Sequence, residues 1–267
     1  MTILDDIVKY KRTDELPRRM AAREPAMVRA EAALAPAPLD VVARLRADQR
    51  VALIAEVKKA SPSKGVIRAK FDPVEISEAY ASAGAAGISV LTDGKYFQGK
   101  LGYLTQIRDR LTQRYGDRRP VLLRKDFIFD PYQVYEARAV GADALLLIAA
   151  VLNDEEMANL LALTRRLGLT ALIEVHNREE LARVLPLEPT LIGVNTRNLH
   201  DFSVDLNTCI ELRQQVPAHI CFVAESGIHT AADVARLARE GVDAILVGEA
   251  LMKSKNIGRK VKELLAY

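Results

Sequence analysis

The sequence of 267 residues contains no tryptophan, two cysteines and four histidines. Cys209 and Cys221 are too few for a disulfide framework, which excludes a small secreted scaffold held together by disulfides. The histidines and cysteines lack the close spacing of zinc ligands, so we expect no metal site built by the protein. Long apolar runs are also missing. The longest, at residues 144–152, is far below the roughly 20 residues that a membrane helix requires.

Neither sign of charge is in large excess. The 38 basic and 35 acidic residues give a net charge of +3, and the basic residues are dispersed along the chain. The positive charge is too small and too dispersed to indicate a nucleic-acid partner, although it suits a small anionic ligand. The first residues, MTILDDIVKYKR, carry two acids where a signal peptide would have its apolar core. We therefore expect a cytoplasmic protein that binds neither nucleic acid nor membrane.

Apolar runs rich in β-branched residues recur along the whole chain, in an ordinary globular composition that is 49% hydrophobic. In chain order they read VALIAEV, GISVLT, PVLLRK, ALLLIAAV, TALIEV, LIGVN, ICFVAE and AILVG, starting at residues 51, 87, 120, 144, 170, 191, 220 and 244. Most are continuously apolar, which is typical of parallel strands that are covered on both faces. Their spacing leaves room for one helix and two short loops between successive strands.

Helix start signals fall between these runs. Asp72-Pro73-Val74-Glu75 combines an N-cap residue, a proline at the first helical position and a glutamate at the third. Related signals begin at Asp130, Asn153, Asn177 and Thr230. A weak internal repeat, GADALL at residues 141–146 and GVDAIL at 241–246, carries the chain from a helix end into a strand. The chain is therefore predicted to alternate strand and helix throughout.

Eight tandem βα units predict a closed (β/α)8 TIM barrel, because open sheets usually have fewer strands. Residues 1–48 precede the first strand, are rich in alanine, arginine and glutamate, and are interrupted at Pro25, Pro36 and Pro38. We expect residues 1–48 to form a helical extension packed on a barrel of residues 49–267, within a single domain. A loosely ordered tail is the alternative.

Charged residues cluster where the predicted strands end, which is where TIM barrels carry their chemistry. Residues two apart on a strand point the same way, so Glu56 and Lys58 can project together toward the barrel axis. Lys125, Glu174 and Glu225 end other strands. Any one of these could be a solvated rim residue, but buried charges of both signs stabilise one another and shift each other's pKa values. A pocket of lysines and glutamates suits proton transfer on a carbon skeleton.

Two further features suggest what the pocket holds. Gly227 and Gly248 each follow one of the last two strands and precede a helix, at the place where barrels frequently bind phosphate. Tight turning alone would also explain them. Phe97, in the loop DGKYFQG, and Phe127 could line a slot for a flat ring, although ordinary loop packing explains them equally well.

Over essentially its whole length the chain resembles the indole-3-glycerol phosphate synthase family. The resemblance is carried by ILDDIVKYKR, AEVKKASPSKG, SVLTDGKYFQG, LLRKDFIFDPYQVYEARAVGADALLLI, IEVHN, GVNTRNL, AESGI and LVGEALM. It implies conversion of 1-(2-carboxyphenylamino)-1-deoxyribulose 5-phosphate into indole-3-glycerol phosphate, with loss of carbon dioxide and water. It also implies that no metal or organic cofactor takes part.

The resemblance assigns roles to single residues. It implies that Lys125 is the general acid of ring condensation and that Glu174 acts in dehydration, together with Glu56 and Lys58. Asn195 and Glu225 would complete the catalytic group, with Glu225 as a charge partner. The implied substrate contacts are Arg197, Ser61 and Pro62 of a flexible loop, and the ring-pocket residues Phe97, Phe127 and Leu199. The implied phosphate-binding residues are Ser226, Gly227, Gly248 and Glu249.

Glu249 departs from part of the family, where a small hydroxyl residue follows the glycine. Its carboxylate would repel a phosphate, so we expect only the backbone N–H of residue 249 to bind there.

Other functions stay open from the sequence. One alternative is another phosphate-binding barrel, such as phosphoribosylanthranilate isomerase or the tryptophan synthase alpha subunit, which should lack AEVKKASPSKG and LLRKDF. A non-catalytic scaffold is the second alternative, and the full set of charged residues argues against it. Association with other tryptophan-pathway enzymes is left open.

Overall fold

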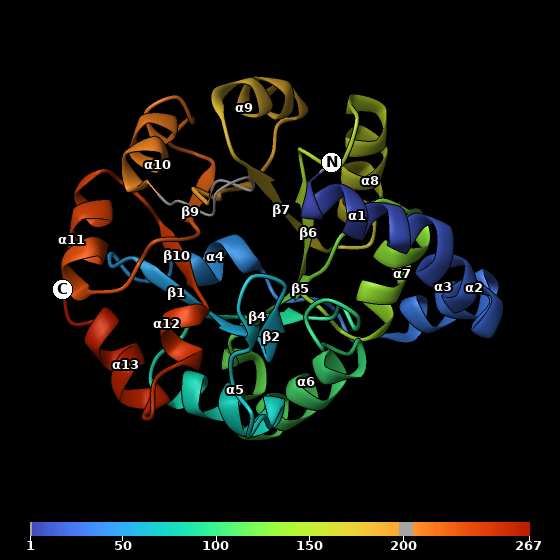
Figure 1. Cartoon of the computed structure of the whole chain (residues 1–267), viewed down its shortest axis with the longest axis horizontal. Helices are drawn as coiled ribbons and strands as arrows, with labels where there is room; N and C mark the ends of the chain where they lie inside the picture. The colour runs from blue at the N-terminus through green and yellow to red at the C-terminus, as the bar shows by residue number, and fades with distance from the viewer. Residues whose placement is uncertain (1, 198–204) are drawn as a thin grey trace.

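The computed structural model describes residues 2–197 and 205–267, and within them eight parallel strands close into a barrel (Figure 1). Every neighbouring pair is parallel, and β1 closes the ring by pairing with β10. The barrel strands are β1 (Ala52–Val57), β4 (Gly87–Leu91), β5 (Val121–Lys125), β6 (Ala144–Ile148), β7 (Thr170–Val175), β8 (Leu191–Val194), β9 (Cys221–Ala224) and β10 (Ala244–Val247). The predicted TIM barrel is confirmed.

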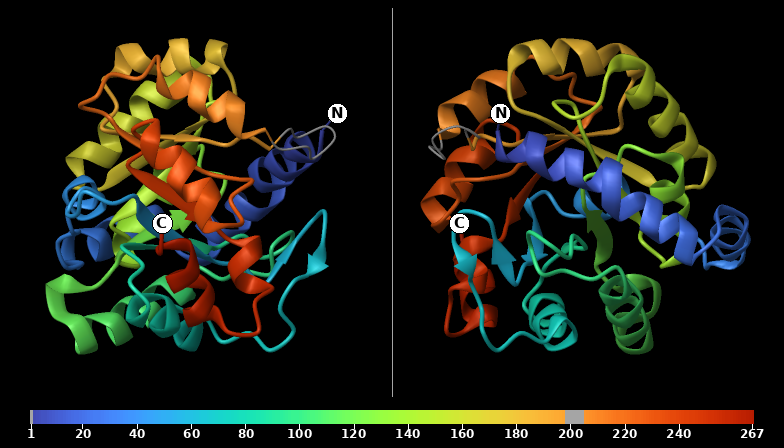
Figure 2. Two further views of the ribbon diagram at one scale, coloured as in Figure 1. Left: turned by 90° about the vertical axis from the view of Figure 1, so that its left-hand side faces the viewer. Right: turned by 45° about the vertical axis from the view of Figure 1, so that its right-hand side comes forward.

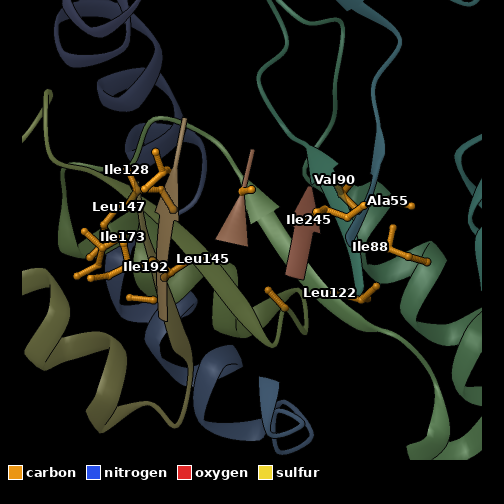
Figure 3. Packing of buried hydrophobic residues seen from close by; sticks show 14 of the residues in the cluster. Ala55, Ile88, Val90, Leu122, Ile128, Leu145, Leu147, Ile173, Ile192 and Ile245 are labelled. Atoms are coloured by element: carbon orange, nitrogen blue, oxygen red, sulfur yellow. The ribbon is translucent and has the colours of Figure 1, made fainter. Parts of the chain in front are cut away.

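Alternate residues of each strand face opposite sides of the barrel wall, as the pleat of a strand requires. Ile54, Leu172 and Leu246 belong to a cluster that fills the interior. Outward residues such as Leu122 and Ile173 are buried in a second, larger cluster, part of which Figure 3 shows. Because both faces of the sheet are buried, the strands read as continuous apolar runs.

Helices surround the barrel (Figure 1). They are α5 (Pro73–Ser82), α6 (Gly102–Tyr115), α7 (Pro131–Ala139), α8 (Asp154–Arg166), α9 (Arg178–Val184), α10 (Leu206–Arg213), α11 (Ala231–Arg239), α12 (Glu249–Met252) and α13 (Ile257–Leu264), with short 3-10 turns at Gly116–Arg118 and Leu185–Leu187. The predicted caps begin these helices: the Asp72 side chain accepts hydrogen bonds from the N–H groups of Val74 and Glu75. At Asp130 the capping box is completed by Gln133.

Among the described residues, four α-helices precede β1. They are α1 (Ile3–Tyr10), continued by a π-helical turn (Lys11–Glu15), α2 (Leu16–Ala22), α3 (Pro25–Leu34) and α4 (Val41–Leu45). Val41 and Leu45 of α4 join the interior cluster, so this short helix closes the end of the barrel where the strands begin. Figure 2 shows α1 running across the opposite end. These segments are helical and packed, unlike a loosely ordered tail.

The loop after β1 carries a small antiparallel hairpin of β2 (Ala60–Ser61) and β3 (Gly65–Val66). It stands over the end of the barrel where the strands finish. Across the described ranges, no helix combines the length and the apolar character that crossing a membrane would require.

Candidate active site

A cavity of about 240 Å³ opens at the carboxyl ends of the strands. Nearly all of the predicted site residues line it: Glu56, Lys58, Ser61, Pro62, Phe97, Lys125, Phe127, Glu174, Asn195, Arg197, Glu225, Ser226, Gly227, Gly248 and Glu249. Leu199 lies outside the described residues. The structure thus brings together residues that are as far as 193 positions apart in the chain, Glu56 and Glu249.

The charged groups continue the inward-facing rows of the barrel. Glu56 follows the interior residue Ile54 by two positions, and Glu174 follows Leu172 in the same way. Glu56, Glu174 and Glu225 are only 3–4% exposed. These three glutamates are therefore not solvated rim residues, and each needs a partner for its buried charge.

Lys125 joins two of the three glutamates. Its Nζ lies 3.5 Å from Oε2 of Glu174 and 3.4 Å from Oε2 of Glu225. Burial disfavours the charged ammonium, but the carboxylates of Glu225, Glu174 and Glu56 outweigh burial and raise the pKa of Lys125 above its usual value. Lys125 therefore carries a proton at neutral pH and can donate it inside the cavity.

The two glutamates that contact Lys125 have pKa values shifted in opposite directions. Burial would raise the pKa of Glu174, but nearby Lys125 and His176 outweigh burial and hold this pKa below its usual value. For Glu225, burial and the adjacent charge of Glu174 both raise the pKa above its usual value. Two carboxyl groups with opposite shifts in one pocket can serve as base and acid, respectively.

Asn195 helps to orient Glu174. Its Nδ2 donates a hydrogen bond to Oε1 of Glu174 (3.3 Å). Its Oδ1 accepts hydrogen bonds from Oγ of Ser226 (2.8 Å) and from the backbone N–H of Arg197 (3.1 Å). With all of these bonds made, the side chain of Asn195 has little freedom to turn, and the end of β8 is tied to the end of β9.

Two glycines have no side chain where a buried carboxylate packs against them. A Cβ at position 248 would overlap Oε1 of Glu56, which is itself ion-paired with Lys58. A Cβ at position 193 would overlap Oε1 of Glu225. Gly248 was predicted to bind phosphate, and its missing side chain also makes room for the Glu56–Lys58 pair. Gly193 was not singled out from the sequence.

The turn after β9 has an unusual backbone. Ser226 has φ 152° and Gly227 has φ 77°, values in the region that L-residues rarely adopt. Such conformations tend to occur at functional sites, where surrounding contacts hold them. This turn is where the sequence places part of a phosphate site.

The side chain of Glu249 is paired with cations. Lys253, one helical turn further along, forms an ion pair with it, and Nη2 of Arg197 lies 3.8 Å from its Oε2. Hydrogen bonding to Lys253 is the main reason that the pKa of Glu249 lies below its usual value. The carboxylate is thus ionised and already partnered at the mouth of the cavity.

One wall of the cavity is apolar. The rings of Phe97 and Phe127 have centroids 6.1 Å apart and are tilted by 40°. Ile3, Leu4 and Ile7 of α1 also line the cavity. A flat aromatic ring could rest against these apolar side chains.

Two parts of the site were missed from the sequence. His176 lines the cavity between Glu174 and Glu180, and alternation along β7 could have found it, since it lies two positions after Glu174. The residues of α1 gave no comparable signal, because nothing in their pattern tells which end of the barrel they cover.

A buried ion network fastens the π-helical turn that continues α1 to the barrel. Nζ of Lys11 lies 2.9 Å from Oδ2 of Asp93 and 2.8 Å from Oδ1 of Asp126, the residue next to Lys125. Burial would raise the pKa of Asp126, but Lys11 and Arg124 outweigh burial and lower it. The network therefore links the position of α1 to the end of β5.

Comparison with known sequences identifies the family. The sequence profile described as indole-3-glycerol phosphate synthase matches residues 4–264. A protein of that name from Roseiflexus sp. (strain RS-1) is 52% identical over 265 residues, which are 98% of each chain. The protein of that name from Rhodopirellula baltica is 46% identical over 266 residues, with full coverage of both chains.

Solved structures share the fold at low sequence identity. A 3-hexulose-6-phosphate synthase has a TM-score of 0.63 at 15% identity, with 81% of this chain and 99% of that chain covered. A chain of the tryptophan synthase complex from Pyrococcus furiosus has a TM-score of 0.60 at 15% identity, with 81% and 98% covered. These likenesses support the barrel alone, whereas the sequence matches extend over the whole chain and its site. The chain therefore belongs to the indole-3-glycerol phosphate synthase family.

Proposed function

We propose that this chain closes the pyrrole ring of 1-(2-carboxyphenylamino)-1-deoxyribulose 5-phosphate, releasing carbon dioxide and water and forming indole-3-glycerol phosphate. The observation that carries this proposal is the buried Lys125 ammonium, held between Glu174 and Glu225 beside an aromatic wall. This arrangement offers a proton donor, a base and a surface for a flat ring within one cavity.

The first step is condensation. Lys125 gives a proton to the ketone oxygen of the substrate while the ring carbon that bears the carboxylate attacks the ketone carbon. A C–C bond forms and the ketone becomes a hydroxyl group. Loss of carbon dioxide then returns the bonding electrons to the ring and restores its aromaticity. Glu174 and Glu225 keep Lys125 charged until the substrate arrives.

The second step is dehydration. The new hydroxyl group leaves as water after it gains a proton, and a base removes a proton from the neighbouring carbon so that the double bond of indole forms. Glu174 is the base in this proposal, because its low pKa keeps it ionised. Glu56 and Lys58 assist as an ion pair that can exchange protons with the substrate.

Binding uses the groups around the mouth. Phe97 and Phe127 hold the anthranilate ring, Arg197 and Asn195 meet polar groups, and Ser61 and Pro62 close from the loop after β1. Ser226, Gly227, Gly248 and the backbone N–H of residue 249 hold the phosphate, together with the ammonium of Lys58. The pairing of the Glu249 side chain with Lys253 supports the view that its carboxylate does not contact the phosphate.

Indole emission provides a direct test, because the chain has no tryptophan and only eight tyrosines. Purified protein is mixed with the carboxyphenylamino-deoxyribulose phosphate, and fluorescence of the product is followed over time. We expect emission to grow with wild-type protein and not with Lys125→Ala. Substrate binding without any emission would instead indicate a binding protein, and the absence of binding would contradict the proposal altogether.

We also propose that the protein is located in the cytoplasm. This location suits the two free, buried cysteines, Cys209 and Cys221. Association with other enzymes of tryptophan biosynthesis would be tested by co-elution of the purified proteins in gel filtration.

A further inference from the structure

His176 is a third basic side chain next to the buried carboxylates. Its Nε2 lies 3.3 Å from Oε1 of Glu174, and its Nδ1 is hydrogen-bonded to Oε2 of Glu180 at 3.1 Å. The side chains of Glu174 and His176 are only 5% and 14% exposed. An imidazole placed between two carboxylates is stabilised as a cation by both of them.

Lys125 is shared between two carboxylates, which leaves room for a further cation beside Glu174. Lys58 pairs with Glu56, whereas Nζ of Lys125 lies 3.5 Å from Glu174 and 3.4 Å from Glu225. A protonated His176 would give Glu174 a second cation. The groups that act on Glu174 are Lys125 from β5, His176 and Asn195, with Glu56 and Glu225 opposing them.

Glu180 fixes the ring from outside the cavity. It is not among the cavity-lining residues, and its Oε2 also accepts a hydrogen bond from the backbone N–H of His176 at 2.8 Å. Glu180 is in turn held in the first turn of α9, where its N–H donates to Oδ1 of Asn177. A chain of contacts therefore runs from α9 through His176 to Glu174.

We propose that His176 is a positioning residue of this site, held as an imidazolium by Glu180 so that it keeps Glu174 ionised and correctly placed. This inference rests on the proposed function, in which Glu174 is the base of dehydration. The pKa of His176 agrees with it: burial lowers this pKa, but Glu174 and Glu180 outweigh burial and raise it to about 10. The charge matters more than the hydrogen bond, because Nε2 has no partner with hydrogen-bond geometry among the described residues.

The protonation of His176 can be measured without turnover. In an NMR titration of the histidine ring protons, assigned by comparison with His176→Gln, the His176 signal should stay in its protonated position well above pH 8. In Glu180→Gln, which keeps the shape of the side chain and an oxygen acceptor, the imidazole loses one of its carboxylates. Its titration should then move to lower pH by about one unit or more.

Kinetics separate positioning from a structural role. His176→Gln should move the acid limb of the kcat profile to higher pH and lower kcat at neutral pH about tenfold, with KM changed less than about threefold. Glu180→Gln should move the alkaline limb to lower pH, because the imidazolium loses its proton sooner. His219→Gln, at an exposed position outside the cavity, is the matched control and should overlay the wild-type profile.

Different results would overturn the role of His176 and the proposed function. A wild-type His176 that titrates near 6.5 in an active enzyme would overturn the inference alone. So would pH profiles of His176→Gln and Glu180→Gln that coincide with wild type, or a change confined to KM. Wild-type protein that makes no indole product would overturn the proposed function, and the catalytic part of this inference with it. Glu180→Gln keeps the test decisive if His176→Gln fails to fold.

Discussion

The ammonium of Lys125 is buried between two carboxylates, and its removal should affect turnover more than substrate binding. We expect Lys125→Met to lower kcat by about 10²–10⁴-fold, because the proton donor of condensation is lost. KM should change little, since methionine fills similar space. The measurement is steady-state indole fluorescence with substrate titration, and near-normal turnover would contradict the role given to Lys125.

Gly193 lies inside β8 and leaves room for the carboxylate of Glu225. We expect Gly193→Ala to displace that carboxylate, lower kcat and cost about 1–3 kcal/mol of stability by overpacking. Gly102→Ala is the control, because a Cβ there meets no atom within 4 Å. Stability is read from urea denaturation of both variants. Equal stability and activity in the two would show that Glu225 relaxes without consequence.

The charged residues that line the cavity were the most predictable part of the site. Residues such as Glu56 and Glu174 are charges within apolar runs, and strand alternation alone places them inward. His176 follows the same rule, but its contact with Glu180 depends on where α9 begins, and no pattern along β7 predicts it. The close approach of Gly193 to Glu225 depends on the pairing of neighbouring strands and could not be read from either residue.

A buried lysine directly after α1 ties this helix to the barrel. We expect Lys11→Met to remove the ammonium from Asp93 and Asp126, leaving Asp126 with Arg124, and to destabilise the protein by about 3–5 kcal/mol. Because α1 lines the cavity with Ile3, Leu4 and Ile7, KM for the substrate should rise.

Hydrogen exchange provides the second measurement for this variant. The amides of α1 should exchange faster in Lys11→Met than in wild type, while those of β6 and β7 should change less. Lys9→Met, at an exposed position on the same helix, serves as the control and should leave exchange unchanged. If α1 kept its protection without Lys11, its apolar contacts would be sufficient to hold it.

The strands and helix starts were predicted better than the way in which the helices pack on the barrel. The strands and their caps have local signals, because each depends on the periodicity and end residues of one segment. The placement of α4 at one end of the barrel and of α1 at the other depends on contacts between residues far apart in the chain, such as Lys11 with Asp126. Such contacts leave no periodic pattern in the segment itself.

The stability of the whole molecule should depend on His176 at alkaline pH. Its pKa is about 10 in the folded protein against an ordinary value of 6.5, so the folded state binds more protons between these values. The contribution is fully present below pH 6.5 and is lost as pH rises through 10, by at most about 1.4 kcal/mol per pH unit. Urea denaturation of wild type and His176→Gln between pH 6.5 and 9.5 should show a steeper fall in wild type.

The extension and the barrel are proposed to form one domain, with residues 1–48 and 49–267 unfolding together. α3 packs on α7 and α4 fills one barrel end, so neither part should keep its core alone. Thermal unfolding followed by circular dichroism and by tyrosine fluorescence should give coincident transitions. A separate early transition in either signal would indicate an independently melting extension.

The first and last strands close the barrel, and this closure sets an order for folding during synthesis. α4 emerges from the ribosome early, but the interior that receives Val41 and Leu45 includes residues of β10, and Arg46 pairs with Asp243 just before that strand. This helix must therefore wait until almost the whole chain has been translated. At about 5–20 residues per second, its apolar face stays uncovered for roughly ten seconds or more, a period in which a chaperone could shield it.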